Sequence, residues 1–242
     1  ADPEAYQFNL RRAADWLAGM QSSNGGFAAF DIDNTYYYLN EIPFADHGAL
    51  LDPPSSDVTA RCTGFLALYG DPQHQQMVER GLAFLFNEQE SNGSWFGRWG
   101  SNYIYGTWSV LEAMQLAKVD CNHAAIRKAV QWLKSKQRSD GGWGETNDTY
   151  LDTQQAGEFN VSTSFQTAWA LLGLMAVGEV NSAAVQKGIG YLMRTQADDH
   201  LWSEPWFTAP GFPRVFYLKY HGYSKYFPIW ALIRYRALTA ES

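Results

Sequence analysis

Residues 130–143 read VQWLKSKQRSDGGW, and closely similar stretches occur at three other places in the chain. In each, an aromatic residue precedes Leu, Gln follows that Leu by four positions, and a polar turn leads to a second aromatic residue. The other copies are ADWLAGMQSSNGGF (14–27), LAFLFNEQESNGSW (82–95) and GYLMRTQADDHLW (190–202). Such self-similarity is the signature of a repeat architecture, in which each unit packs against its neighbours.

Each copy predicts a pair of helices, one ending near the Gln and one following the turn, with apolar residues three and four positions apart. The first helices are expected to begin near Pro3, Gln73, Asn122 and Asn181. The second are expected over 56–69, 107–117, 163–177 and 227–240. Four helical hairpins without a substantial sheet must cover one another's apolar faces. They predict an all-α fold, an α/α toroid forming a partial α6-α6 barrel, with residues 1–242 as a single domain.

The composition is that of a packed globular chain, because 46% of the 242 residues are hydrophobic and only 18% are charged. A net charge of -7 argues against a nucleic-acid partner, whose phosphates require clustered Lys and Arg. Cys62 and Cys121 form no CxxC pair and read as reduced thiols, which suits the cytoplasm. An aromatic content of 16% indicates that ring faces serve more than packing.

Two features concern membranes and the chain ends. The longest apolar stretch, near residues 168–177, is too short to span a bilayer. The chain opens almost directly on a predicted helix, so we expect a longer polypeptide upstream. The closing residues 234–242, RYRALTAES, read as a natural C-terminus.

The repeated Gln-to-Trp turn resembles the QW motif of triterpene cyclases. In that family the Gln ends one helix, hydrogen-bonds toward the start of the next and stacks on the aromatic ring, which would satisfy unpaired helix-end groups. The first copy departs from the pattern by Phe in place of Trp, and the last lacks the Gly. The predicted pairs are Gln21 with Phe27, Gln89 with Trp95, Gln137 with Trp143, and Gln196 with Trp202.

Three further stretches, residues 30–61, 93–108 and 204–228, resemble squalene-hopene cyclases in order and spacing. The resemblance covers the whole chain and implies the C-terminal part of such an enzyme. It implies a cofactor-free isomerase that folds squalene and stabilises carbocations during polycyclisation to hopanoids. The implied partners are squalene and the N-terminal part of the same enzyme. The full-length enzyme would lie in the cytoplasm, on the inner membrane face, and a homodimer is compatible with the resemblance.

The family protonates its substrate with an Asp of a DxDD motif, and the sequence DIDN at 31–34 only resembles that motif. By the same resemblance the true DxDD lies upstream of this chain. We therefore interpret Asp31 and Asp33 as turn-forming residues. The isolated chain is predicted to be inactive.

Asp57, Arg61 and Tyr105 are the predicted catalytic residues. Residues 53–56 end a loop and cap a helix, which places Asp57 in the first turn and Arg61 on the same face. Compensation of the helix dipole and a surface ion pair would also explain this spacing. By resemblance, Asp57 matches a cavity-floor Asp, Arg61 matches a His that contacts the catalytic Asp, and Tyr105 matches a Tyr that helps to reprotonate it.

Aromatic residues supply the predicted wall, because a ring face attracts a cation without offering a lone pair. The rings that match family wall positions are Phe30, Trp99, Phe212, Phe216, Tyr220 and Tyr223. A turn at 211–213 is expected to present Phe212, and Arg98 is expected to anchor its loop. Phe44, with Ala45 and His47, lies in a stretch that resembles the constriction before the cavity. A helical stripe of rings is equally typical of a core, which is our interpretation of Trp206, Phe207, Tyr217, Tyr226 and Trp230.

Other functions remain open from the sequence. An oxidosqualene cyclase would share the motifs. A protein prenyltransferase shares the toroid but needs an Asp/Cys/His zinc site, and the sequence offers no convincing set, so no metal or cofactor is predicted. A non-catalytic toroid that binds proteins or glycans would carry its aromatic residues on a surface instead of in a pocket.

Overall fold

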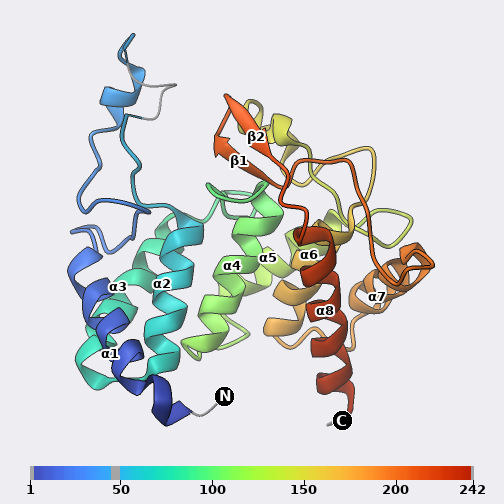
Figure 1. Ribbon diagram of the computed structural model, residues 1–242, viewed down its shortest axis with the longest axis horizontal. Coiled ribbons are helices and arrows are strands. Elements are labelled where there is room, and N and C mark those ends of the chain that lie inside the picture. Colours follow the sequence, from blue (N-terminus) through green and yellow to red (C-terminus); the bar gives the residue numbers. More distant parts are fainter. Residues whose placement is uncertain (1–2, 45–49, 241–242) are drawn as a thin grey trace.

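A computed structural model describes residues 3–44 and 50–240 of the protein (Figure 1). This part of the chain contains eight α-helices, as the repeat predicted. They are α1 (Pro3–Met20), α2 (Ser56–Tyr69), α3 (Gln75–Asn87), α4 (Tyr103–Leu116), α5 (Ala124–Ser135), α6 (Ser164–Ala176), α7 (Ala183–Thr195) and α8 (Tyr223–Ala240).

The repeated turn joins the helices along the chain in four successive pairs, the hairpins α1–α2, α3–α4, α5–α6 and α7–α8. The outer helices α3 and α7 pack mainly on the preceding central helices, α2 and α6. Helices α2, α4, α6 and α8 pack consecutively in a central row, with α3, α5 and α7 outside them. The row is curved, because α8 reaches back to α4: Arg234 Nη1 lies 2.8 Å from both carboxylate oxygens of Glu112. Trp108 of α4 likewise meets Phe227 and Trp230 of α8. This curvature is that of part of an α/α toroid, and the all-α prediction is confirmed.

The Gln residues of the repeat tie each turn to the next outer helix. Gln89 Nε2 donates to Gly93 O and to Ala125 O in the first turn of α5, both at 2.9 Å. The same pair of bonds is made by Gln21 (to Gly25 O and Met77 O) and by Gln137 (to Gly141 O and Ala184 O). The predicted link toward the next helix is confirmed, but the Gln donates to carbonyls and does not pair the unpaired N–H groups of the helix start.

The aromatic partner instead donates to a carbonyl group at the helix end. The indole Nε1 of Trp95 donates to Leu85 O at 2.6 Å, in the last turn of α3. Trp143 and Trp202 donate in the same way to Leu133 O and Leu192 O. Carbonyls of a last helical turn lack an intrahelical donor, so each indole N–H fills that need. The ring of Phe27 is buried at the equivalent position but, unlike an indole, has no N–H to donate.

The Gln-to-aromatic turn that connects the two helices of a hairpin is called a joint below. The fourth joint differs from the other three, and the structure explains why it lacks the glycine. Gln196 Nε2 donates to His200 O, and His200 adopts a left-handed φ of 63°. A Cβ at the equivalent positions of the other joints would lie 2.5 to 2.8 Å from a carbonyl oxygen of the next outer helix, so only glycine fits there (Gly25, Gly93 and Gly141). No outer helix follows the fourth turn among the described residues, which leaves space for a side chain.

Two predicted boundaries were wrong. Helices α4 and α8 begin at Tyr103 and Tyr223, not near residues 107 and 227. The first N–H groups of α4 find an acceptor in Glu145, far along the chain, so a local pattern could not show this start. The predicted turn at 211–213 is also displaced, because Gly211 belongs to a strand and the chain reverses after Phe212.

The remaining elements are short. The strands β1 (Ala209–Phe212) and β2 (Phe216–Leu218) form an antiparallel hairpin. The loops within the described ranges contain the 3-10 helices η1 (Tyr37–Glu41), η3 (Pro72–His74), η4 (Asn147–Tyr150) and η5 (Thr153–Gln155). None of the helices in the described ranges combines the length and hydropathy that crossing a bilayer requires.

Candidate active site

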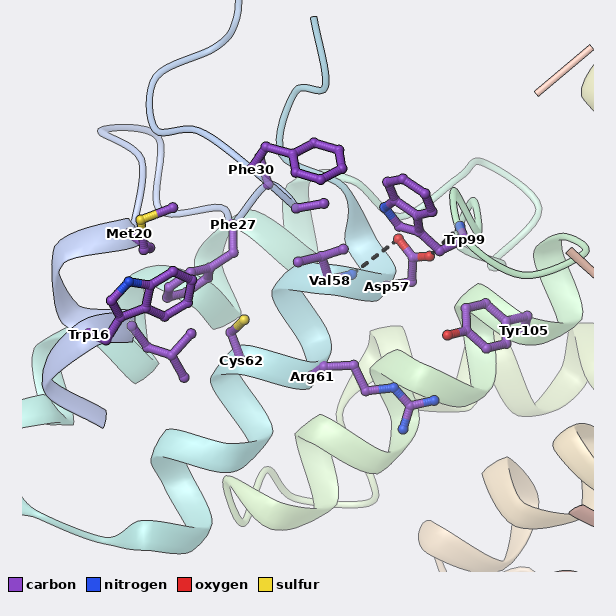
Figure 2. A pocket seen from close by; sticks show the side chains of 13 residues that line it. Trp16, Met20, Phe27, Phe30, Asp57, Val58, Arg61, Cys62, Trp99 and Tyr105 are labelled. Carbon is purple, nitrogen blue, oxygen red and sulfur yellow. Dashed lines mark hydrogen bonds between the residues drawn. The ribbon is translucent and has the colours of Figure 1, made fainter. Parts of the chain in front are cut away.

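A pocket of about 400 Å³ lies between α1, the start of α2 and the loop that precedes α4 (Figure 2). Its wall contains five of the residues predicted from the sequence: Phe30, Asp57, Arg61, Trp99 and Tyr105. Two rings, a carboxyl group, a guanidinium group and a phenol that lie far apart in the sequence are thus brought together. Apolar side chains of α1 and α2 complete most of the wall.

Asp57 is held at the start of α2 by three hydrogen bonds. Its side chain is only 1% exposed. Its Oδ1 accepts from Ser55 Oγ at 2.7 Å and from Val58 N at 3.1 Å, and its Oδ2 accepts from Trp99 N at 2.7 Å. Burial raises the pKa of the Asp57 carboxyl group, and these donors oppose that rise. The result is a buried acid on the wall of a mainly apolar pocket.

Arg61 does not pair with Asp57, so the surface ion pair that the spacing allowed is not formed. Its guanidinium extends toward α4 (Figure 2), where Nη2 donates to Ser109 Oγ at 3.2 Å. Cζ lies 4.2 Å from the centroid of the Trp108 ring and 5.8 Å from that of Tyr105. Stacking on an aromatic face stabilises a cation, so these rings fix the guanidinium beside the pocket.

Tyr105 lies in the first turn of α4, edge-on to Trp169 with the ring centroids 5.0 Å apart. Burial, reinforced by the charge of Asp57 and opposed by that of Arg61, raises the pKa of Tyr105 to about 12. The phenol therefore keeps its proton at neutral pH and can act as a hydrogen-bond donor.

Trp99 and Arg98 belong to the loop before α4. The Trp99 ring stands edge-on to Phe30, with centroids 6.1 Å apart. Arg98 Nε binds Asp52 Oδ1 at 3.0 Å, and Asp52 Oδ2 accepts from Ala29 N at 3.1 Å. The prediction that Arg98 anchors the loop is confirmed. Its partner Asp52 was not predicted, although an Asp directly before two prolines at a loop end was a usable signal.

Trp16 of α1 also lines the pocket and was missed, because the repeat identified it only as a helix position. The equivalent rings of the other hairpins are buried (Phe84, Trp132 and Tyr191), whereas Trp16 is 61% exposed. The difference between equivalent positions becomes visible only when the neighbours of each helix are known.

The other predicted wall residues do not line this pocket. Phe212 and Phe216 contact each other on the β-hairpin, with centroids 5.5 Å apart. Tyr220 stacks on Tyr223. Tyr223 in turn contacts Trp169, the neighbour of Tyr105. The predicted rings therefore lie in separate groups, and their convergence on one cavity stays a prediction.

Three sequence predictions concern the loop that follows α1. Phe44 is 87% exposed and does not line the pocket, and Ala45 and His47 lie outside the described residues. Asp33 has a φ of 54° and accepts from Ser23 N at 2.6 Å, which confirms it as a turn residue. In the described part of the chain, no group of three or more His, Cys, Asp or Glu side chains could hold a metal ion.

A curved row of hairpins joined by Gln and Trp, with an aromatic pocket holding a buried acid, places the chain among the α/α toroids found in terpene cyclases. The solved ent-copalyl diphosphate synthase from Streptomyces platensis has a similar fold, with a TM-score of 0.61 and 18% identity over 93% of this chain and 37% of that one. A family model described as the squalene-hopene cyclase C-terminal domain matches residues 1–237, and the chain belongs to this family.

Two relatives show how closely the chain follows the family. It is 58% identical to the squalene-hopene cyclase of Zymomonas mobilis subsp. mobilis, over 96% of this chain and 35% of the relative. It is 46% identical to the squalene-hopene cyclase of Alicyclobacillus acidocaldarius subsp. acidocaldarius, over 91% of this chain and 35% of the relative. The chain thus spans about a third of the length of these relatives.

Proposed function

We propose that this chain is the C-terminal part of a squalene-hopene-type cyclase, which folds squalene and stabilises carbocations during polycyclisation to hopanoids. The observation that carries the proposal is the pocket in which Phe30, Trp99 and Tyr105 surround the buried acid Asp57. Ring faces can stabilise a carbocation by about 2 kcal/mol each when water is excluded. No cofactor is needed, because the reaction is an intramolecular isomerisation.

Each polar residue has a role in the proposal. Asp57 forms the polar floor of the cavity, and Tyr105 forms part of the hydrogen-bonding route that returns a proton to the catalytic acid. Arg61 is a permanent cation that would lower the pKa of a carboxylic acid placed next to it. Trp108 and Ser109 hold this charge in place. Phe30 and Trp99 form the near wall.

The remaining parts of the proposal concern the longer enzyme. The DxDD acid and the rest of the cavity belong to its N-terminal part, so the isolated chain lacks activity. Attachment to the inner membrane face from the cytoplasm and a homodimer are proposed with it. In that enzyme the other predicted rings join the wall, namely Phe44, Phe212, Phe216, Tyr220 and Tyr223.

The pocket can be tested with N,N-dimethyldodecylamine, whose ammonium group imitates the cation, and with dodecanol as an uncharged control. We expect calorimetry to show that the chain binds the amine more tightly than the alcohol. Trp99→Ala should weaken amine binding by about 2 kcal/mol, or about thirtyfold. Trp206 lies outside the pocket, so Trp206→Ala should leave amine binding unchanged. Equal binding of amine and alcohol would contradict the proposed role of the rings.

Catalysis is tested separately with squalene. The isolated chain should yield no polycyclic product, whereas the enzyme that includes the upstream DxDD segment should yield a hopanoid. Polycyclic product from the isolated chain would show that the acid lies within residues 1–242.

A further inference from the structure

Two glutamates, Glu145 buried and Glu204 half-buried, occupy the same position of the repeat and reach back to the preceding hairpin. Glu145 is the second residue after Trp143, and Glu204 is the second after Trp202. The Glu145 carboxylate accepts from the first N–H groups of α4, and Glu204 accepts from Ser164 N at the start of α6. Each glutamate therefore caps the central helix of the hairpin before its own, where negative charge is favoured.

The Glu145 side chain is only 3% exposed and fully engaged. Its Oε2 accepts from Ile104 N at 2.9 Å and Asn102 N at 3.3 Å, and its Oε1 accepts from Tyr103 N and Gly157 N at 3.1 Å each. Four N–H donors on two oxygens use the full accepting capacity of the carboxylate. The start of α4 is therefore built around this carboxylate.

The loop that carries Glu145 also holds the loop before α4. Tyr150 Oη lies 2.7 Å from Gly97 O and 2.8 Å from Gly100 O. Asn102 Nδ2 donates to Thr149 Oγ1 at 3.0 Å. The third hairpin thus fixes both ends of the segment 97–102, although neither Tyr150 nor Glu145 lines the pocket.

This segment and the start of α4 carry the two pocket side chains of the second hairpin, Trp99 and Tyr105. Trp99 N donates to Asp57 Oδ2 at 2.7 Å, and Tyr105 follows in the first turn of α4. The segment and the helix start are pressed together, because a Cβ at Gly100 would lie 2.5 Å from the Tyr105 ring. A shift at the start of α4 must therefore move the Tyr105 ring and the Trp99 N–H.

From these contacts we infer that Glu145 is a positioning residue of the pocket: it fixes the start of α4 and the 97–102 loop, and through them Trp99 and Tyr105. Its importance for catalysis rests on the proposed function, whereas the geometric claim does not. Glu204 provides a matched control from the same repeat position, because it caps α6. That helix contributes no residue to the pocket and donates to the 97–102 segment through one side chain, from Gln166 Nε2 to Ser101 O.

The test compares Glu145→Gln with Glu204→Gln in the 242-residue chain. An amide group in place of the carboxylate turns N–H donors toward the N–H groups of the capped helix. Hydrogen exchange of the Trp99 amide, followed by NMR, should accelerate about tenfold in E145Q and stay within about twofold in E204Q. Binding of N,N-dimethyldodecylamine should weaken about tenfold in E145Q and stay unchanged in E204Q.

A similar acceleration of Trp99 exchange in both variants, or none in E145Q, would overturn the inference. If circular dichroism shows that E145Q does not fold, Tyr150→Phe takes its place, because it removes a single hydroxyl group from the same loop and should also accelerate Trp99 exchange. Should the unsubstituted chain fail to bind the amine, the proposed function fails. Trp99 exchange would still decide the positioning role.

Discussion

Two junctions between neighbouring hairpins each place a carboxylate against backbone N–H groups, but the carboxylate comes from opposite sides of the junction. Between the second and third hairpins, the loop supplies the carboxylate, Glu145, and the helix start supplies the N–H groups. Between the first and second, the helix supplies the carboxylate, Asp57, and the loop supplies the N–H of Trp99. Gly97 stands where the loop glutamate would be, and a Cβ there would lie 2.2 Å from Asn102 O.

The exchange leaves only one of these carboxylates on the wall of the pocket. Glu145 is enclosed by four backbone N–H groups. Asp57 is also buried, but it forms part of the wall of an apolar pocket. Moving the acid from the loop to the helix turns a sealed structural junction into one side of a cavity. The repeat thus makes a site by exchanging donor and acceptor at a single junction.

The largest expected effect on stability comes from removing Glu145, the carboxylate of the junction between the second and third hairpins. Glu145→Ala leaves four backbone N–H groups without their acceptor, and each such buried group costs about 1–3 kcal/mol. We expect the free energy of unfolding, measured with urea, to fall by about 4 kcal/mol or more. Glu204→Ala should cost less, because the Glu204 carboxylate accepts from one backbone N–H, that of Ser164. Equal losses would show that the two caps are equivalent.

The junction between the first and second hairpins, which contains Asp57, is tested by measuring stability against pH. Burial raises the pKa of Asp57 above its ordinary value of 3.8, so the folded chain keeps this proton to a higher pH than the unfolded chain. Its contribution to stability is therefore present below about pH 4, declines as the pH rises through the folded pKa, and then levels off. Asp57→Asn should lack this decline, visible as the difference between two curves of unfolding free energy against pH. Parallel curves would contradict a raised pKa at Asp57.

A smaller effect is expected from the indole hydrogen bond, which the second joint has and the first lacks. Trp95→Phe gives the second joint the aromatic residue that the first has at Phe27, and it removes the hydrogen bond from the indole to Leu85 O. Relative to Trp132→Phe, whose indole Nε1 has no partner in the described structure, we expect an additional loss of about 1–2 kcal/mol. Thermal denaturation of both variants measures the difference. A larger loss for the Trp132 variant would argue against this role of the indole bond.

The smallest effect concerns the fourth joint, where His200 holds a left-handed φ that glycine adopts freely. His200→Gly should stabilise the chain by about 1 kcal/mol, as measured by its melting temperature. Gly141→Ala makes the opposite change at the third joint and should destabilise it, because the new Cβ would lie 2.6 Å from Lys187 O. Stabilisation by both substitutions would show that the next outer helix does not require the glycine.

The sequence by itself determined the helices and their order. The Gln-to-Trp spacing and the apolar periodicity act within one or two turns of chain, and they located all eight helices of the described residues. The same local signals marked Asp57 at a helix start and Arg61 on the same face of that helix. Family resemblance then added Trp99 and Tyr105 to the candidate site. All four residues line one pocket.

Only the tertiary structure decided what those residues contact. The start of α4 depends on Glu145, the partner of Arg61 is Trp108 and not Asp57, and Trp16 enters the pocket because its surroundings differ from those of the equivalent rings. Each of these results depends on a contact between residues far apart in the sequence. Periodicity reports the face of a helix that is buried, but the neighbour on that face is chosen by the packing of the whole chain.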